Sequence, residues 1–81
     1  MKIEHEGREY ELIRGSDVSN DGVFLEAWSQ EEPRSLLLFA FRSDADGGFT
    51  FTAYQENLPF SLVEQFIQVA RADLPPTTSN Q

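Results

Sequence analysis

The chain has 81 residues, of which 14 are acidic and 6 basic, so its formal net charge is −8, and it contains no cysteine. A chain of this length forms one domain with a small hydrophobic core, since many domains of roughly 60 residues fold alone. The charge disfavours nucleic-acid and membrane partners, because phosphate groups and anionic lipids repel an acidic surface. The absence of cysteine excludes disulfides and thiolate metal sites.

No hydrophobic segment of this sequence resembles a targeting or anchoring signal. No apolar run approaches the ~20 residues that a membrane-spanning helix needs. Residues 1–6 carry early charges and no apolar signal core. We therefore expect a cytoplasmic protein whose partner is a protein with a basic surface, or a second copy of the chain.

Two short segments of alternating polarity open the chain. Ile3 and His5 alternate with charged neighbours, and a second alternating segment runs from Arg8 to Arg14. Glu6-Gly7 between them suits a two-residue turn, because glycine readily adopts a positive φ. This pattern predicts a β-hairpin, followed by a loop over residues 15–22, where glycine, serine, asparagine and aspartate dominate.

Three further strands are predicted over residues 23–28, 35–42 and 49–55. The segment 35–42 reads Ser-Leu-Leu-Leu-Phe-Ala-Phe-Arg and is apolar on both alternating faces, so it needs cover on both sides of its sheet. The segment 49–55 alternates aromatic residues with threonine, which is typical of a strand. Polar connections occupy residues 29–34 and 43–48.

The hydrophobic period then changes from 2 to about 3.6, which predicts an amphipathic helix. Two start signals compete: Pro59 as the first helical residue, or Ser61 with Glu64 as a capping box. Pro75-Pro76 ends the helix, and residues 75–81 are predicted to be a disordered polar tail. One helical face carries the apolar residues Leu62, Val63, Phe66, Ile67, Ala70 and Leu74.

These elements predict a single α+β domain over residues 1–74, with a five-stranded antiparallel meander and one C-terminal amphipathic helix on one face. The pairing of faces between strands depends on turn geometry. We expect the helix to cover the bulkier face, with Val23, Leu25, Phe39, Phe41, Phe49 and Phe51. The opposite face, here called the second face, then collects Phe24, Trp28, Leu36, Leu38, Thr50, Thr52 and Tyr54.

The second face is the main candidate for function. It is larger than the apolar patches that monomers usually expose, and tryptophan, phenylalanine and tyrosine are enriched at interface centres. A strong twist of the sheet, or the connection 29–34, is the alternative cover for these side chains. The predicted contact residues are Phe24, Trp28, Leu36, Leu38 and Tyr54, with an acidic rim of Glu26, Glu31 and Glu32.

Catalytic and metal-binding patterns are nearly absent. His5 is the only histidine, and no serine lies in a nucleophile elbow. Asp44 and Asp46 in one loop, and Asp17 and Asp21 in another, are weak calcium candidates. A calcium loop needs a bidentate acid at its twelfth position, where the chain has Gln55. We therefore expect neither catalysis nor a cofactor.

A small, acidic, cysteine-free α+β chain is similar in general character to bacterial immunity proteins. This resemblance implies a non-catalytic, bacterial protein-binding module that occludes a partner through the second face. Two alternatives stay open from the sequence. One is a homodimer that packs through the second face, and the other is a calcium- or ligand-responsive domain.

Overall fold

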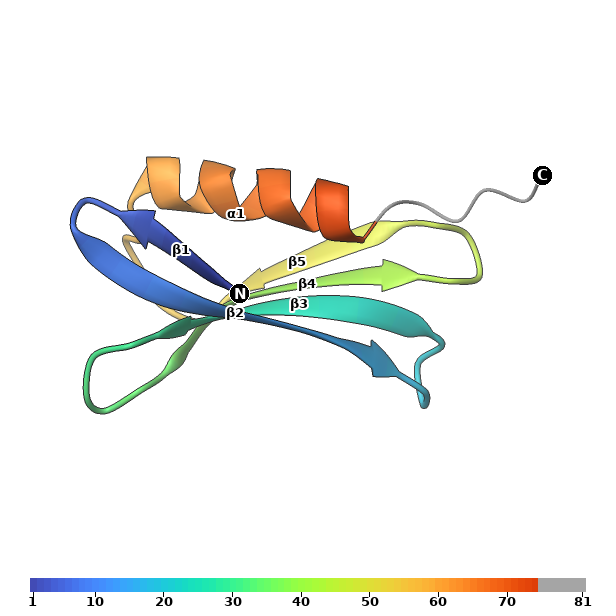
Figure 1. Cartoon of the computed structure of the whole chain (residues 1–81). Helices are drawn as coiled ribbons and strands as arrows, with labels where there is room; N and C mark the ends of the chain where they lie inside the picture. The colour runs from blue at the N-terminus through green and yellow to red at the C-terminus, as the bar shows by residue number, and fades with distance from the viewer. Residues whose placement is uncertain (75–81) are drawn as a thin grey trace.

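The computed structural model describes residues 1–74, and the predicted tail at 75–81 lies outside the described residues. Helix α1 (Phe60–Asp73) follows a five-stranded antiparallel sheet whose strands lie in chain order (Figure 1). The predicted α+β meander with a C-terminal helix is therefore confirmed. The strands are β1 (Lys2–His5), β2 (Arg8–Asp17), β3 (Gly22–Ser29), β4 (Leu36–Ser43) and β5 (Phe49–Ala53).

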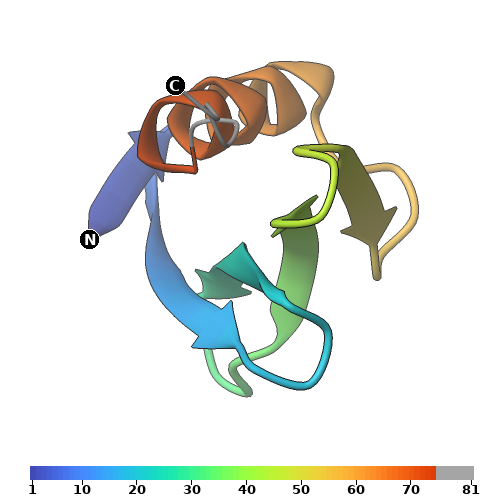
Figure 2. The same cartoon turned by 90° about the vertical axis from the view of Figure 1, so that its right-hand side faces the viewer.

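The sheet is strongly curled, and α1 lies across its open side between β1 and β5 (Figure 2). Side chains of α1 reach both sides of the curl. Gln65 Nε2 donates a hydrogen bond to the carbonyl oxygen of Glu4 at 3.3 Å, and the ring of Phe66 lies 6.3 Å from that of Phe51. A single helix therefore packs on the concave face and leaves the convex face without a helix.

The hydrophobic core fills the space between α1 and the concave face. The helix contributes Leu62, Phe66 and Ala70, spaced four residues apart, and Leu74 beyond its end. Ile67 is 37% exposed, so it lies at the margin of this face rather than at its centre. The sheet contributes the buried side chains of Tyr10, Leu12, Leu25, Ala27, Leu37, Leu38 and Ala40.

The start of α1 differs from both sequence-based alternatives. Pro59 is the N-cap residue and no side chain caps the helix, so the predicted Ser61–Glu64 capping box does not form. The Ser61 hydroxyl oxygen instead lies 2.6 Å from His5 Nε2, which joins the end of β1 to the first turn of α1. The amide groups of Leu62 and Val63 donate to the carbonyl oxygen of Pro59.

A β-bulge in β4 decides which of its side chains face α1. Ala27 pairs with Leu38 and Trp28 pairs with Leu36, so Leu37 is the extra residue. Leu37 and Leu38 consequently both enter the core, at 5% and 0% exposure. The predicted placement of Leu38 on the second face is therefore wrong, because strict alternation does not anticipate a bulge.

The rest of β4 is also turned the other way from the prediction. Ala40 pairs with Leu25 and Phe51 on the helix side, so Phe39 and Phe41 point away from α1. The expectation that the helix covers these two rings is wrong. Ala40 and Ala70 of α1 are both buried and line the same groove, where their small side chains suit the contact between β4 and α1.

Strands β2 and β3 extend further than their composition suggests, and the loop between them spans only residues 18–21. Gly15 lies opposite Phe24, and a Cβ atom at Gly15 would lie 2.6 Å from that ring. The ring of Phe41 covers Gly22 in the same way. An aromatic ring over a glycine shields the exposed backbone, which supports strand pairing where composition predicts a loop.

Two phenylalanines of α1 offer a matched test of this packing, since Phe66 is fully buried and Phe60 is 77% exposed. We expect Phe66→Ala to lower the free energy of unfolding by about 3–5 kcal/mol, because it removes a buried ring and leaves a cavity. Phe60→Ala should change it by less than about 0.5 kcal/mol. Urea denaturation followed by circular dichroism measures both values. Equal losses would contradict the orientation of α1.

The two covered glycines should respond differently to an added methyl group. In Gly22→Ala the new Cβ would collide with both the Phe41 ring and the carbonyl oxygen of Arg42. We expect this variant to lose about 1–3 kcal/mol of stability in thermal unfolding. Gly15→Ala should lose less, because only the partly exposed Phe24 ring must move. A greater loss at Gly15 would show that the rings do not lie over these glycines.

Candidate functional site

The convex face of the sheet carries a continuous group of apolar side chains from β2, β3 and β4. The strand register places them in three adjacent rows, and α1 lies on the opposite side of the sheet (Figure 2). No helix or strand within residues 1–74 covers this face. We call this group the outer patch; its members are Ile13, Phe24, Trp28, Leu36, Phe39 and Phe41.

The rings of the outer patch lie against their own sheet. Phe24 stacks on Phe39 with ring centroids 5.7 Å apart and an interplanar angle of 24°. The Phe24 and Phe41 rings also cover Gly15 and Gly22, as described above. These aromatic residues are therefore half-buried although no other element packs on them. The result is a convex apolar surface whose rings are held in place before any partner binds.

Trp28 is held by two polar neighbours. Its indole Nε1 donates a hydrogen bond to Glu26 Oε1 at 2.9 Å, and the guanidinium of Arg34 lies 5.6 Å from its ring centroid. Such an arrangement is typical of a cation–π contact. The connection between β3 and β4 thus reaches one ring of the patch through Arg34.

Three of the predicted contact residues, Phe24, Trp28 and Leu36, come together in the outer patch, and Glu26 lies among them. Leu38 is in the core, and Tyr54 lies beyond the end of β5 at 57% exposure. Of the predicted rim, Glu31 forms an ion pair with Arg8 at the end of the sheet, and Glu32 is exposed. The prediction missed three members: Ile13, Phe39 and Phe41. The placement of Phe39 and Phe41 on this face could be predicted only by locating the bulge in β4.

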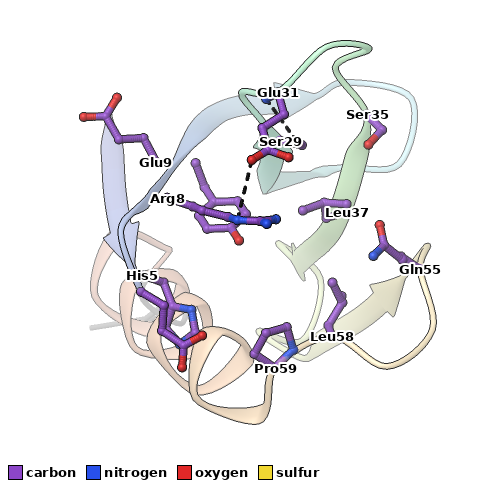
Figure 3. A pocket seen from close by; sticks show the side chains of 12 residues that line it. His5, Arg8, Glu9, Ser29, Glu31, Ser35, Leu37, Gln55, Leu58 and Pro59 are labelled. Atoms are coloured by element: carbon purple, nitrogen blue, oxygen red, sulfur yellow. Dashed lines mark hydrogen bonds and ion pairs between the residues drawn. The ribbon is translucent and has the colours of Figure 1, made fainter.

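One end of the curled sheet holds a cavity of about 480 Å³, here called the end cavity (Figure 3). The β1–β2 turn, the ends of β3 and β4, and the segment before α1 surround it. Tyr10 and Leu37 are buried in its wall, and Leu58 beside them is half-buried. Arg8 and Glu31 lie at its mouth with Arg8 Nε 3.5 Å from Glu31 Oε2. The lining is therefore mainly polar, with a smaller apolar part formed by Tyr10, Leu37, Leu58 and Pro59.

His5 also lines the end cavity, where it approaches Ser61. A serine hydroxyl next to an imidazole is the first half of a nucleophile–base arrangement. A triad needs a carboxylate hydrogen-bonded to the other ring nitrogen, and no hydrogen bond or ion pair joins His5 to a carboxylate of residues 1–74. The contact serves here as a link between β1 and α1.

A third surface lies between β5 and α1. Phe49, Phe51 and Ile67 are exposed there by 39%, 47% and 37%, and they line a groove of about 170 Å³ together with Arg71. β5 is an edge strand, and all five of its residues are exposed and uncharged. An edge of this kind is open to pairing with another strand.

The two aspartate-rich loops lie side by side, since the amide of Asp44 donates to the carbonyl oxygen of Asp21 at 2.8 Å. Three of their four carboxylates, those of Asp17, Asp44 and Asp46, are already engaged. Asp17 accepts hydrogen bonds from the side chain and backbone of Asn20, which lower the pKa of Asp17. Asp44 binds Arg42 at 2.7 Å, and Asp46 accepts from the Gly48 amide at 2.8 Å. Residues 1–74 hold no group of three acidic or histidine side chains placed to bind a metal.

A scan against protein-family models finds no matching family, and searches of curated proteins and of solved structures find no match. Within the part of the chain that the structure describes, no helix has the length and apolar character needed to cross a membrane. The function must therefore be sought in the three surfaces themselves.

Proposed function

We propose that this chain is a small, non-catalytic protein-binding module that contacts its partner through the outer patch. The outer patch itself carries the proposal, since six apolar residues lie side by side on a face that no helix or strand of residues 1–74 covers. Contiguous apolar surface of this kind is typical of interaction sites. Tryptophan and phenylalanine at its centre are residue types that supply much of the binding energy in interfaces.

The held positions of the rings also favour binding. Phe24 is fixed by Phe39 and Gly15, and Trp28 by Glu26 and Arg34. Side chains that are already ordered lose little conformational entropy when a partner covers them, so more of the contact energy appears as affinity. A preordered aromatic surface suits a partner with a preformed surface of its own.

The charge of the chain indicates the character of that partner. The formal net charge is −8, and Glu26 lies within the outer patch. A basic protein surface would be attracted to this module, and the attraction would mainly raise the association rate. An inhibitor of the bacterial immunity type, which occludes a basic functional surface in the cytoplasm, would combine an acidic charge with an exposed apolar contact surface.

Capture with variants of the outer patch tests the proposal. We expect immobilised wild-type protein to retain a basic protein from a lysate of the source organism, and Ile13→Ser/Trp28→Ala to retain at least tenfold less. The control is Val18→Ser, which removes an 85% exposed apolar side chain from the β2–β3 loop. Circular dichroism confirms that all variants are folded. Equal retention of every captured protein by both variants would refute the proposal.

The exposed edge of β5 supports a second candidate, a homodimer. Two copies of β5 can pair antiparallel about a two-fold axis, since the strand has no charge or proline to prevent it. The rings of Phe49 and Phe51 would then lose solvent exposure. The charge of −8 on each copy opposes this association, so added salt should favour a dimer.

Sedimentation velocity tests the homodimer from micromolar to submillimolar concentration. A dimer should sediment faster as concentration rises. Thr52→Lys should restore the monomer by placing a charge on the edge strand, whereas Thr52→Val should not. A wild-type protein that stays monomeric over the whole range would exclude this candidate.

A further inference from the structure

We propose that the end cavity receives a basic side chain of the protein partner, with the cationic group held by the carboxylates of the rim and by the Tyr10 hydroxyl. This inference rests on the proposed function, because it names the group of the partner that enters the chain. It adds a second, polar contact to the apolar contact made by the outer patch.

The size of the end cavity suits one long side chain. Its volume of about 480 Å³ lies within the roughly 300–1,000 Å³ that is usual for ligand sites. Figure 3 shows Leu37, Leu58 and Pro59 on one part of its wall, with Arg8 and Glu31 across from them. Because segments far apart in the sequence surround this space, its shape depends on the complete fold.

Tyr10 is the observation that points to a ligand. Its side chain lines the end cavity and is only 9% exposed. Its hydroxyl makes no hydrogen bond with any group of residues 1–74, and it is not among the polar atoms sealed from solvent. The hydroxyl oxygen is therefore accessible to solvent, and a group that enters the cavity can replace water as its hydrogen-bond partner.

The charges around the cavity select a cation. The lining contains the carboxylates of Glu6, Glu9 and Glu31 and the guanidinium of Arg8. Lys2 Nζ lies 3.9 Å from Glu9 Oε1, so Glu6 is the lining carboxylate that forms no ion pair within residues 1–74. Glu31 already offsets the charge of Arg8 at 3.5 Å. The N-terminus of α1 would favour an anion rather than a cation, because of the helix dipole. Pro59 has no amide hydrogen to offer an anion, and the net charge of −8 repels anions from the whole chain.

The wall of the cavity suits the rest of a lysine or arginine side chain. The apolar side chains of Leu37, Leu58 and Pro59 would pack against its methylene groups. The aromatic ring of Tyr10 would add a cation–π attraction near the charged end. An uncharged aliphatic side chain would leave the Tyr10 hydroxyl without a partner.

The connection between β3 and β4 contributes residues both to the end cavity and to the contacts of the outer patch. Arg34 of this connection lies on the Trp28 ring, and Glu31 of the same connection binds Arg8 at the cavity mouth. In this proposal a partner that covers the outer patch near Trp28 extends along this connection to the cavity. Glu31 was predicted for the acidic rim of the second face, and its ion pair with Arg8 places it beside the end cavity.

Titration with blocked amino acids, followed by amide chemical shifts, tests the cavity without the partner. We expect N-acetyl-arginine amide to cause saturable shifts at Tyr10, Leu37 and Gln55, which all line the cavity, and N-acetyl-lysine amide to do the same. N-acetyl-citrulline amide, which matches arginine in shape without its charge, and N-acetyl-glutamate amide should cause none. No saturable shift with either basic probe would overturn the inference, and so would equal binding of citrulline or glutamate.

Two variants locate the contacts. Tyr10→Phe keeps the ring and should weaken binding of the arginine probe about two- to tenfold, which corresponds to one hydrogen bond. Glu31→Gln should also weaken it and reduce its salt dependence. Val18→Ser is the control and should leave it unchanged; unchanged binding in both cavity variants would contradict the inference. The capture experiment changes only the outer patch, so either proposal can fail while the other stands.

Discussion

Helix α1 reaches the curled sheet through side chains spaced four residues apart, and the other surfaces depend on this contact. Leu62, Phe66 and Ala70 are buried along it, and Phe66 is fully enclosed. A straight helix fills the concave side of a sheet only if the sheet curls around it, and β1 and β5 lie on its two sides for this reason (Figure 2). The curl also opens the end cavity beside the start of the helix and leaves the convex face uncovered.

Within residues 1–74 no second helix covers the convex face, and its apolar side chains are instead partly buried against the sheet itself. Apolar rings that face water raise the free energy of the folded state, and here Phe24 and Phe41 reduce that exposure by lying over Gly15 and Gly22. The same contact protects the backbone of two strands where glycine would otherwise weaken pairing. The rings are only half-buried by this means. The face is thus stable in the free chain and still retains apolar surface for a partner.

Much of this fold follows from local pattern, and the candidate surfaces follow from it less well. Alternation and a change of period predicted five strands and a helix in the correct order. Gly7 has the positive φ that was predicted for the turn, and Glu6 has one that was not. The bulge at Leu37 is the main feature that the pattern does not contain, since it arises where β3 and β4 must fit each other. It moved Leu38 into the core, while Phe39 and Phe41 lie on the convex face. The end cavity was equally hidden, because distant segments form it.

Electrostatics separates the two ways in which the apolar surfaces can be used. Two copies of a chain with a charge of −8 repel each other, so self-association through β5 gains from salt. A basic partner is attracted, so its binding is weakened by salt. The positions of the acids favour the second case: Glu26 lies within the outer patch, and Glu31 at the cavity mouth. By contrast, β5 carries no acid, and Arg71 lies in the groove beside it. The surface with acidic residues is thus the one suited to a foreign, basic protein, and the uncharged edge is the one suited to a second copy.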